Sequence, residues 1–275
     1  MTKTKKVFIT VKTYPSISKK YDELVCTAGI LEDGSWVRIY PLPFRKLEYD
    51  NRYHKYQWME IPLEKNRTDV RPESFQVTDL AKIKLLDKVG TRQGWKERRE
   101  IVFRKETAFS DIKNLISRAN NNELSLAIFK PTRIIDFIWE ESSREWSKAK
   151  LDLLKSKAQQ LSLFQTPEEV AKEFSVVKKL PYKFSYRFAD AVGQETTLMI
   201  EDWEIGMLYW HCLEKSRNNE EEALQKVKQK YFIEFPKKDL YLFLGTTKKF
   251  HGWAKNPFVI IGIFYPPMKQ QLSFL

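Results

Sequence analysis

Residues 24–43, LVCTAGILEDGSWVRIYPLP, decide the fold that this sequence predicts. Residues 24–31 are apolar and β-branched enough to form a strand. Asp33-Gly34 then favours a tight turn, because glycine accepts a positive φ without steric cost. Ser35 to Tyr40 forms the return strand, and Pro41-Leu42-Pro43 ends it. The stretch therefore predicts a β-hairpin near the start of a β-rich domain.

The return strand of this hairpin has two different faces. Side chains alternate along a strand, so Val37 and Ile39 share one face, which suits a core. Trp36, Arg38 and Tyr40 share the other face. Two aromatic planes beside a guanidinium could stack bases and hold phosphate, as in proteins that bind single strands. The alternative is that Trp36 and Tyr40 bury against a helix while Arg38 pairs with a carboxylate, and the sequence leaves both interpretations open.

Composition favours a folded, basic protein. The chain has 275 residues, 42% of them hydrophobic and 14% aromatic, and a formal net charge of +12. Such an excess of positive charge favours polyanionic partners such as nucleic acid, although it can also serve solubility. Two cysteines, Cys26 and Cys212, are too few for a disulfide scaffold. No apolar run approaches the length that spans a membrane, and we expect a cytosolic protein without membrane partners.

Two further stretches combine basic and aromatic residues. Arg92, Lys96, Arg98 and Arg99 surround Trp95, a pattern that fits a nucleic-acid surface or a solvated face. In residues 182–188, alternation places four aromatic side chains on one face, which is typical of a core, and Lys183 and Arg187 on the other. We assign all six basic residues, with Trp36, Arg38 and Tyr40, to a predicted nucleic-acid-binding surface.

A five-residue motif lies between the two β-rich halves. Gln160, Leu161, Ser162, Leu163 and Phe164 resemble, at all five positions, the peptide by which bacterial replication and repair proteins dock onto the DNA polymerase sliding clamp. In such peptides the glutamine occupies a polar pocket and the apolar residues fill a cleft. The resemblance implies a partner-binding segment. The alternative is that Leu161 and Phe164 end the apolar face of a helix.

Longer stretches resemble uncharacterised bacterial proteins with two OB-like small barrels. The resemblance implies nucleic-acid or nucleotide binding, in settings such as genome defence or mobile elements, and transfers no catalytic residue. The residues that carry it are 25–29, 33–41, 181–188, 202–204 and 243–246. We therefore expect an α+β protein in which two OB-like barrel domains are joined by a helical connector. The expected boundaries are 1–140, 141–178 and 179–275. Strand 134–139 should close the first barrel or sheet, and helices should start at Ser110, Asp202 and Asn219.

Catalytic chemistry has little support in the sequence. His54, His211 and His251 lack the spacing of a zinc site, and no phosphate-binding loop or dinucleotide fingerprint is present. We therefore predict no catalytic residues, no metal site and no cofactor. An enzyme that cleaves or modifies nucleic acid is one alternative function. A nuclease could use Asp111 with Glu97 and Glu100, although an acid at a helix start has an ordinary explanation. A non-catalytic subunit of a defence or mobile-element complex is the other.

Overall fold

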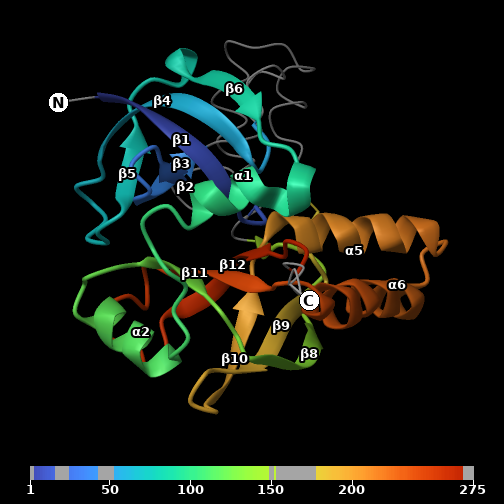
Figure 1. The fold of residues 1–275 in the computed structure, drawn as a ribbon. Helices are drawn as coiled ribbons and strands as arrows, with labels where there is room; N and C mark the ends of the chain where they lie inside the picture. Colours follow the sequence, from blue (N-terminus) through green and yellow to red (C-terminus); the bar gives the residue numbers. More distant parts are fainter. Residues whose placement is uncertain (1–2, 16–24, 43–52, 149–151, 153–177, 269–275) are drawn as a thin grey trace, which may run out of the picture.

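The computed structural model describes residues 3–15, 25–42, 53–148, 152 and 178–268. These residues form two β-rich units that pack against each other, with one helix, α1, at their junction (Figure 1). The elements of the first unit are β1 (Lys3–Lys12), β2 (Val25–Leu31), β3 (Trp36–Leu42), β4 (Gln57–Lys65), β5 (Ser74–Val77), η3 (Leu80–Lys82), β6 (Lys84–Lys88) and α1 (Arg92–Val102).

The first unit is a small five-strand barrel. Its strands follow the order β1-β2-β3-β5-β4, and β4 pairs with β1 to close the ring, while β6 is added beside β4. The contact between β3 and β5 is parallel, and the remaining contacts are antiparallel. Closure leaves no free edge in the ring of five strands. The barrel predicted for the start of the chain is thus confirmed.

The hairpin of β2 and β3 forms as its sequence predicts. Gly34 has a φ of +85°, in the left-handed region that glycine adopts readily. Val37 and Ile39 are fully buried inside the barrel, beside Val7, Ile9 and Met59. The opposite face of β3 therefore points out of the barrel, as the alternation requires.

The second unit is an open, mixed sheet with the order β7-β11-β12-β10-β9-β8, in which only β10 and β12 run parallel. Helices α5 and α6 cover one face of this sheet (Figure 1). Its elements are α2 (Ile112–Asn120), β7 (Leu126–Phe129), β8 (Arg133–Glu141), β9 (Tyr182–Ala189), β10 (Glu195–Ile200), α5 (Trp203–Lys215), α6 (Glu220–Lys228), η4 (Gln229–Glu234), η5 (Phe235–Lys237), β11 (Tyr241–Thr246) and β12 (Phe258–Phe264).

Two fold predictions need correction here. The second unit was expected to be a barrel, but its sheet stays open, with β7 and β8 as its two edges. Strand 134–139 was expected to close the first barrel or sheet. It instead pairs with β9 as part of β8, so the predicted boundary at residue 140 falls inside the second sheet. β8 belongs to this sheet because it pairs with β9 in a long antiparallel register.

Local signals within the second unit are mostly confirmed. Tyr182, Phe184, Tyr186 and Phe188 are buried in its core. Asp202 and Asn219 cap α5 and α6 with their side-chain oxygens, as predicted. The cap of α2 is Asp111 rather than Ser110, because the Asp111 carboxylate accepts from the backbone amides of Lys113 and Asn114. An acid one residue after a serine can take over the cap without changing the helix.

The two units share a hydrophobic core. Phe8, Ile30 and Trp36, on the outer face of the barrel, pack with Phe243 and Ile261 of the second sheet. The indole of Trp36 meets the ring of Phe243 edge-on, with centroids 5.6 Å apart. After β1, the chain also joins the second sheet, since the Tyr14 amide donates to the Glu201 carbonyl at 2.8 Å. This interface fixes the relative position of the two units.

Candidate functional site

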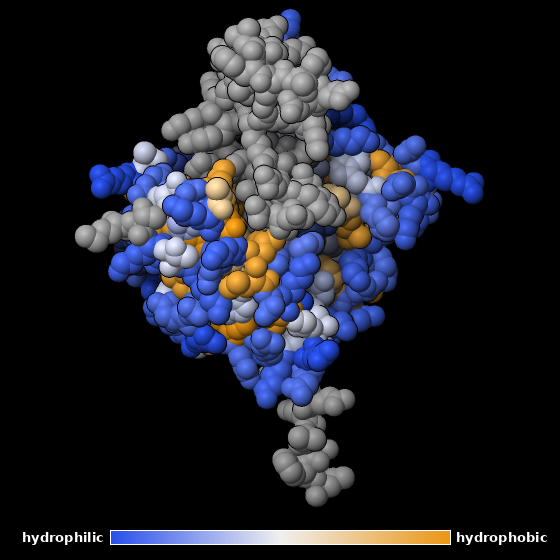
Figure 2. All heavy atoms as spheres, turned by 90° about the horizontal axis from the view of Figure 1, so that it is seen from above, coloured by the Kyte–Doolittle hydropathy of each residue, from blue (hydrophilic) through white to orange (hydrophobic). Residues whose placement is uncertain are grey.

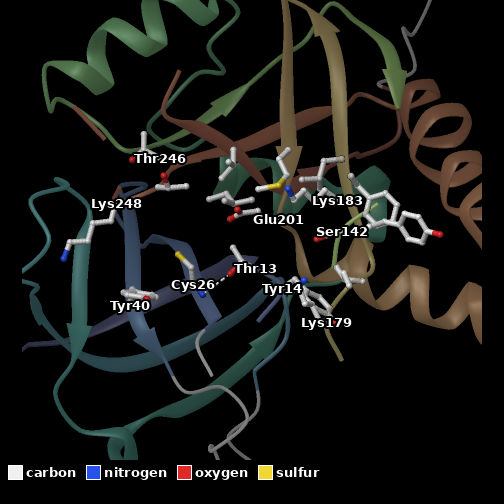
Figure 3. Close-up of a pocket in the computed structure, with 18 of the residues that line it drawn as sticks. Thr13, Tyr14, Cys26, Tyr40, Ser142, Lys179, Lys183, Glu201, Thr246 and Lys248 are labelled. Atoms are coloured by element: carbon white, nitrogen blue, oxygen red, sulfur yellow. Dashed lines mark hydrogen bonds between the residues drawn. The ribbon is translucent and has the colours of Figure 1, made fainter. Parts of the chain in front are cut away.

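The interface between the two units opens into a cleft of about 560 Å³ (Figure 3). One wall comes from the outer face of β2 and β3, which contributes Cys26, Arg38 and Tyr40. The other wall comes from the second sheet, where Lys183 lies on β9 and Glu201 follows β10. The cleft exists because the hydrophobic contact between the units covers only part of the outward face of β3.

Three lysines lie around the cleft, namely Lys179, Lys183 and Lys248. The Lys248 ammonium donates to the Thr68 carbonyl at 2.6 Å, and the Lys179 ammonium donates to the Ser143 carbonyl. Lys183 is exposed. An ammonium has three N–H donors, so one backbone bond leaves two of them for an anion. The cleft can therefore offer several charge-assisted hydrogen bonds to a polyanionic ligand.

Aromatic side chains accompany these cations. Tyr14, Tyr40 and Trp146 line the cleft and are partly exposed. Tyr14 is held in place because its hydroxyl accepts from the Trp210 indole at 2.9 Å and donates to the Lys178 carbonyl at 2.8 Å. Positioned rings next to lysines are the combination that stacks bases and holds the phosphates between them.

Arg38 lies beneath the cleft and is only 2% exposed. Its Nη2 donates to the Ser125 carbonyl at 3.0 Å, and its Nη1 contacts the Cys26 thiol at 3.4 Å. Burial lowers the pKa of Arg38, but a guanidinium keeps its charge at physiological pH. Its Nε has no hydrogen-bond partner among the described residues. Arg38 therefore links the two units and adds a fixed positive charge under the cleft.

A polar loop between β4 and β5 supports the same wall, which sequence reasoning did not anticipate. Asp69 and Arg71 form a buried ion pair, and Arg71 donates to the Thr246 carbonyl at 2.5 Å across the interface. Burial alone would raise the pKa of Asp69, but the hydrogen bonds and charge of Arg71 outweigh it and lower the pKa to about 2. Glu73 accepts from the Ser125 amide and hydroxyl. The charged run Arg-Pro-Glu-Ser at residues 71–74 was the feature of the sequence that could have indicated this loop.

Glu201 is the one carboxylate among the described residues that line the cleft. Burial raises the pKa of Glu201, while attraction to Arg38 opposes that shift. In Figure 3 Glu201 lies between the side of the cleft that carries Tyr40 and Lys248 and the side that carries Lys183. With five basic residues in the lining against this single acid, the cleft remains electropositive.

The predicted binding residues fall into different environments. Arg38, Tyr40 and Lys183 line the cleft. Trp36 is only 6% exposed, so the prediction that it forms an exposed stacking face is wrong. The physical reason is that the second sheet covers this part of β3. The alternative prediction was wrong in part, because Arg38 bonds to Ser125 rather than to a carboxylate. Trp36 is buried, in a cluster that contains Phe243 of the second sheet and Ile101 and Val102 of α1.

The remaining predicted cations do not reach the cleft. Arg98 stacks on Tyr56, and Arg99 pairs with Asp239 at 2.6 Å, so both hold α1 against the two units. Arg187 is exposed and pairs with Glu195 at 2.6 Å. Arg92 and Lys96 are exposed and line a separate hollow beside α1. The structure thus divides the predicted surface into the cleft and a separate basic region on α1.

The acids considered for a nuclease do not gather. Asp111 caps α2, whereas Glu97 and Glu100 lie on α1. Asp202 is buried and pairs with Lys55 at 3.3 Å. Among the described residues no group of three or more histidine, cysteine or acidic side chains is placed to hold a metal ion. The clamp-like segment Gln160–Phe164 lies outside the described residues.

Comparison with known proteins places the chain by family. Residues 3–104 match the model of a domain of unknown function (DUF8758), and residues 105–275 match that of a second (DUF8757). The second match covers more than half of the chain, which therefore belongs to the DUF8757 family. The two matches divide the chain between α1 and α2, where the two units meet. The search of curated proteins finds no match, and no helix in the described part is long and apolar enough to span a membrane.

Proposed function

We propose that the cleft between the barrel and the second sheet binds single-stranded nucleic acid. The observation that carries this proposal is the lining of the cleft, where Lys179, Lys183 and Lys248 lie beside Tyr40 and Trp146. Lysines neutralise phosphates and aromatic rings stack bases. The net charge of +12 adds a long-range attraction to any polyanion. Figure 2 shows a face that is mostly hydrophilic, with apolar residues near its middle.

The topology of the barrel supports the same proposal. We interpret the closed ring in the order β1-β2-β3-β5-β4 as an OB-like barrel. OB barrels bind oligonucleotides on the face of strands 2 and 3. Here the outward face of β2 and β3 provides Cys26, Arg38 and Tyr40 to the cleft. The ligand-binding face of such a barrel and the basic cleft therefore coincide.

A single strand fits this site better than a duplex. Stacking on Tyr40 or Trp146 requires unpaired bases whose faces are accessible. The cleft also lies between two walls of protein, one from each unit, rather than on a convex basic face.

We propose in addition, on the sequence motif alone, that the segment Gln160–Phe164 docks on a sliding clamp. Docking would bring this binding activity to DNA that is being replicated or repaired.

The test is fluorescence anisotropy with labelled oligothymidylate, the same sequence as duplex, and RNA, at low and moderate salt. We expect the single strand to bind most tightly and affinity to fall with salt as counterions are released. Lys183→Ala should weaken binding and reduce the salt slope by about 0.7, the value for one lost phosphate contact on a single strand. Lys82→Ala is the matched control, because Lys82 is 75% exposed on η3, away from the cleft.

Two results would contradict the proposal. The first is the absence of salt-sensitive binding to any of the three nucleic acids. The second is an equal loss of affinity in Lys183→Ala and Lys82→Ala, since this would show that only the total charge matters and that the cleft is not the binding site.

A further inference from the structure

The turn between β11 and β12 presents two exposed aromatic rings. Trp253 is 68% exposed and Phe250 is 39% exposed. Their ring centroids lie 5.7 Å apart, with an angle of 58° between the planes. Two adjacent exposed aromatic rings form an apolar surface that is a candidate for ligand binding. We call residues 247–255 the aromatic turn.

Hydrogen bonds hold the aromatic turn in one conformation. The Phe250 and His251 amides both donate to the Thr247 carbonyl, and the Trp253 indole donates to the Lys249 carbonyl at 2.8 Å. The His251 ring bridges Thr246, at 3.0 Å, and Asn122, at 2.8 Å. Burial lowers the pKa of His251, which keeps the bridging ring neutral at physiological pH. The rings are therefore exposed on an anchored support, and stacking on them costs little ordering entropy.

The charge of the aromatic turn suits an anion. It carries Lys248, Lys249 and Lys255 and contains no aspartate or glutamate. The Lys249 ammonium lies 5.2 Å from the centre of the Phe250 ring. Thr247 and Lys248, at the start of the turn, also line the cleft. The turn is thus continuous with the cleft.

We propose that the aromatic turn is a second stacking site, which receives the part of a single strand that leaves the cleft past Lys248. This inference rests on the proposed function of the cleft. Trp253 lies five positions after Lys248, so their Cα atoms are at most about 18 Å apart. A strand of several nucleotides can bridge that distance. Lysines beside exposed rings favour nucleic acid as the ligand, because phosphates neutralise the ammonium groups while bases stack on the rings.

The test compares oligothymidylates of about 6 and about 18 nucleotides, lengths near the two ends of the range that one such barrel occupies. The longer strand should bind the parent protein more tightly. Trp253→Ala should weaken binding of the longer strand about tenfold, as expected for one lost stacking contact. It should leave binding of the shorter strand and the melting temperature unchanged. Trp253→Phe should restore most of the affinity, and Val192→Ala, which removes another exposed apolar side chain, should have no effect.

The outcomes separate this inference from the proposed function. If both strands bind the parent protein equally, or if Trp253→Ala changes neither, the aromatic turn is not part of the nucleic-acid site, and only the cleft proposal stands. If neither strand binds the parent protein, the cleft proposal fails and the inference fails with it. A loss of affinity for the shorter strand in Trp253→Ala would place the turn inside the cleft site rather than beyond it.

Discussion

Replacing Trp36 by alanine tests whether the two units depend on their shared core. The indole is only 6% exposed and packs edge-on against Phe243 of the other unit. Truncating a buried tryptophan to alanine costs about 3–5 kcal/mol, because it removes apolar burial and leaves a cavity. A whole domain is typically stable by only about 5–15 kcal/mol. The change should therefore remove a large part of the free energy of unfolding.

For a chain of this size, each kcal/mol corresponds to a shift of about 2 °C in Tm. We thus expect Trp36→Ala to lower Tm by about 6–10 °C in calorimetry. Trp253→Ala makes the matched control. It removes the same side chain from a site that is 68% exposed. A surface change of this kind should shift Tm by about 1 °C or less.

Calorimetry also reports whether the units unfold together. Because Phe8, Ile30 and Trp36 share one core with Phe243 and Ile261, the parent protein should show a single cooperative transition. Trp36→Phe keeps an aromatic ring and should lose less stability than Trp36→Ala. A Trp36→Ala protein that melts within about 2 °C of the parent, equivalent to roughly 1 kcal/mol, would refute the reasoning that this contact fixes the interface.

Four further predictions follow from individual residues. Burial, and then the charge of Lys55, lowers the pKa of Lys12 to about 8, so Lys12 opposes folding while protonated. Stability should therefore rise as pH increases from about 8 toward the unfolded value near 10.5, and Lys12→Met should flatten that rise in thermal melts. Gly206→Ala should destabilise the protein by about 1–3 kcal/mol in denaturant titrations despite its better helix propensity, because a Cβ there would lie 2.2 Å from Tyr14. The protein should not cleave DNA with magnesium or manganese, and cleavage abolished by Asp111→Ala would contradict this. Replacing Leu161 and Phe164 by alanine should abolish capture by a purified sliding clamp with Tm unchanged, whereas a lower Tm without clamp binding by the parent would assign both residues to packing.

Local sequence predicted much of the secondary structure. The Asp33-Gly34 turn, the inward face of Val37 and Ile39, and the caps at Asp202 and Asn219 all depend on residues close together in the chain. Their physics is local, since a turn needs a permissive φ and a cap needs an acceptor near free amides. Such features can be inferred from one sequence because no distant partner decides them.

Alternation also identified Arg38, Tyr40 and Lys183 as outward-facing, and the structure brings all three to one cleft. It could not show that Trp36, on the same strand face, would be buried. Alternation divides a strand into two faces but does not say which surface covers each of them. The aromatic turn and the Arg71 contacts were missed because both depend on segments far apart in sequence.

Residue patterns alone were enough to predict a basic, β-rich chain with a hairpin, strands that have one apolar and one polar face, and capped helices. Three features emerged only from the folded molecule: β8 joins the second sheet, this sheet stays open, and the two units share a core beside a basic cleft. The reason is that strand pairing and the packing of one sheet on another are non-local. Several partners satisfy the same hydrophobic pattern, and the choice among them depends on how all the surfaces fit at once.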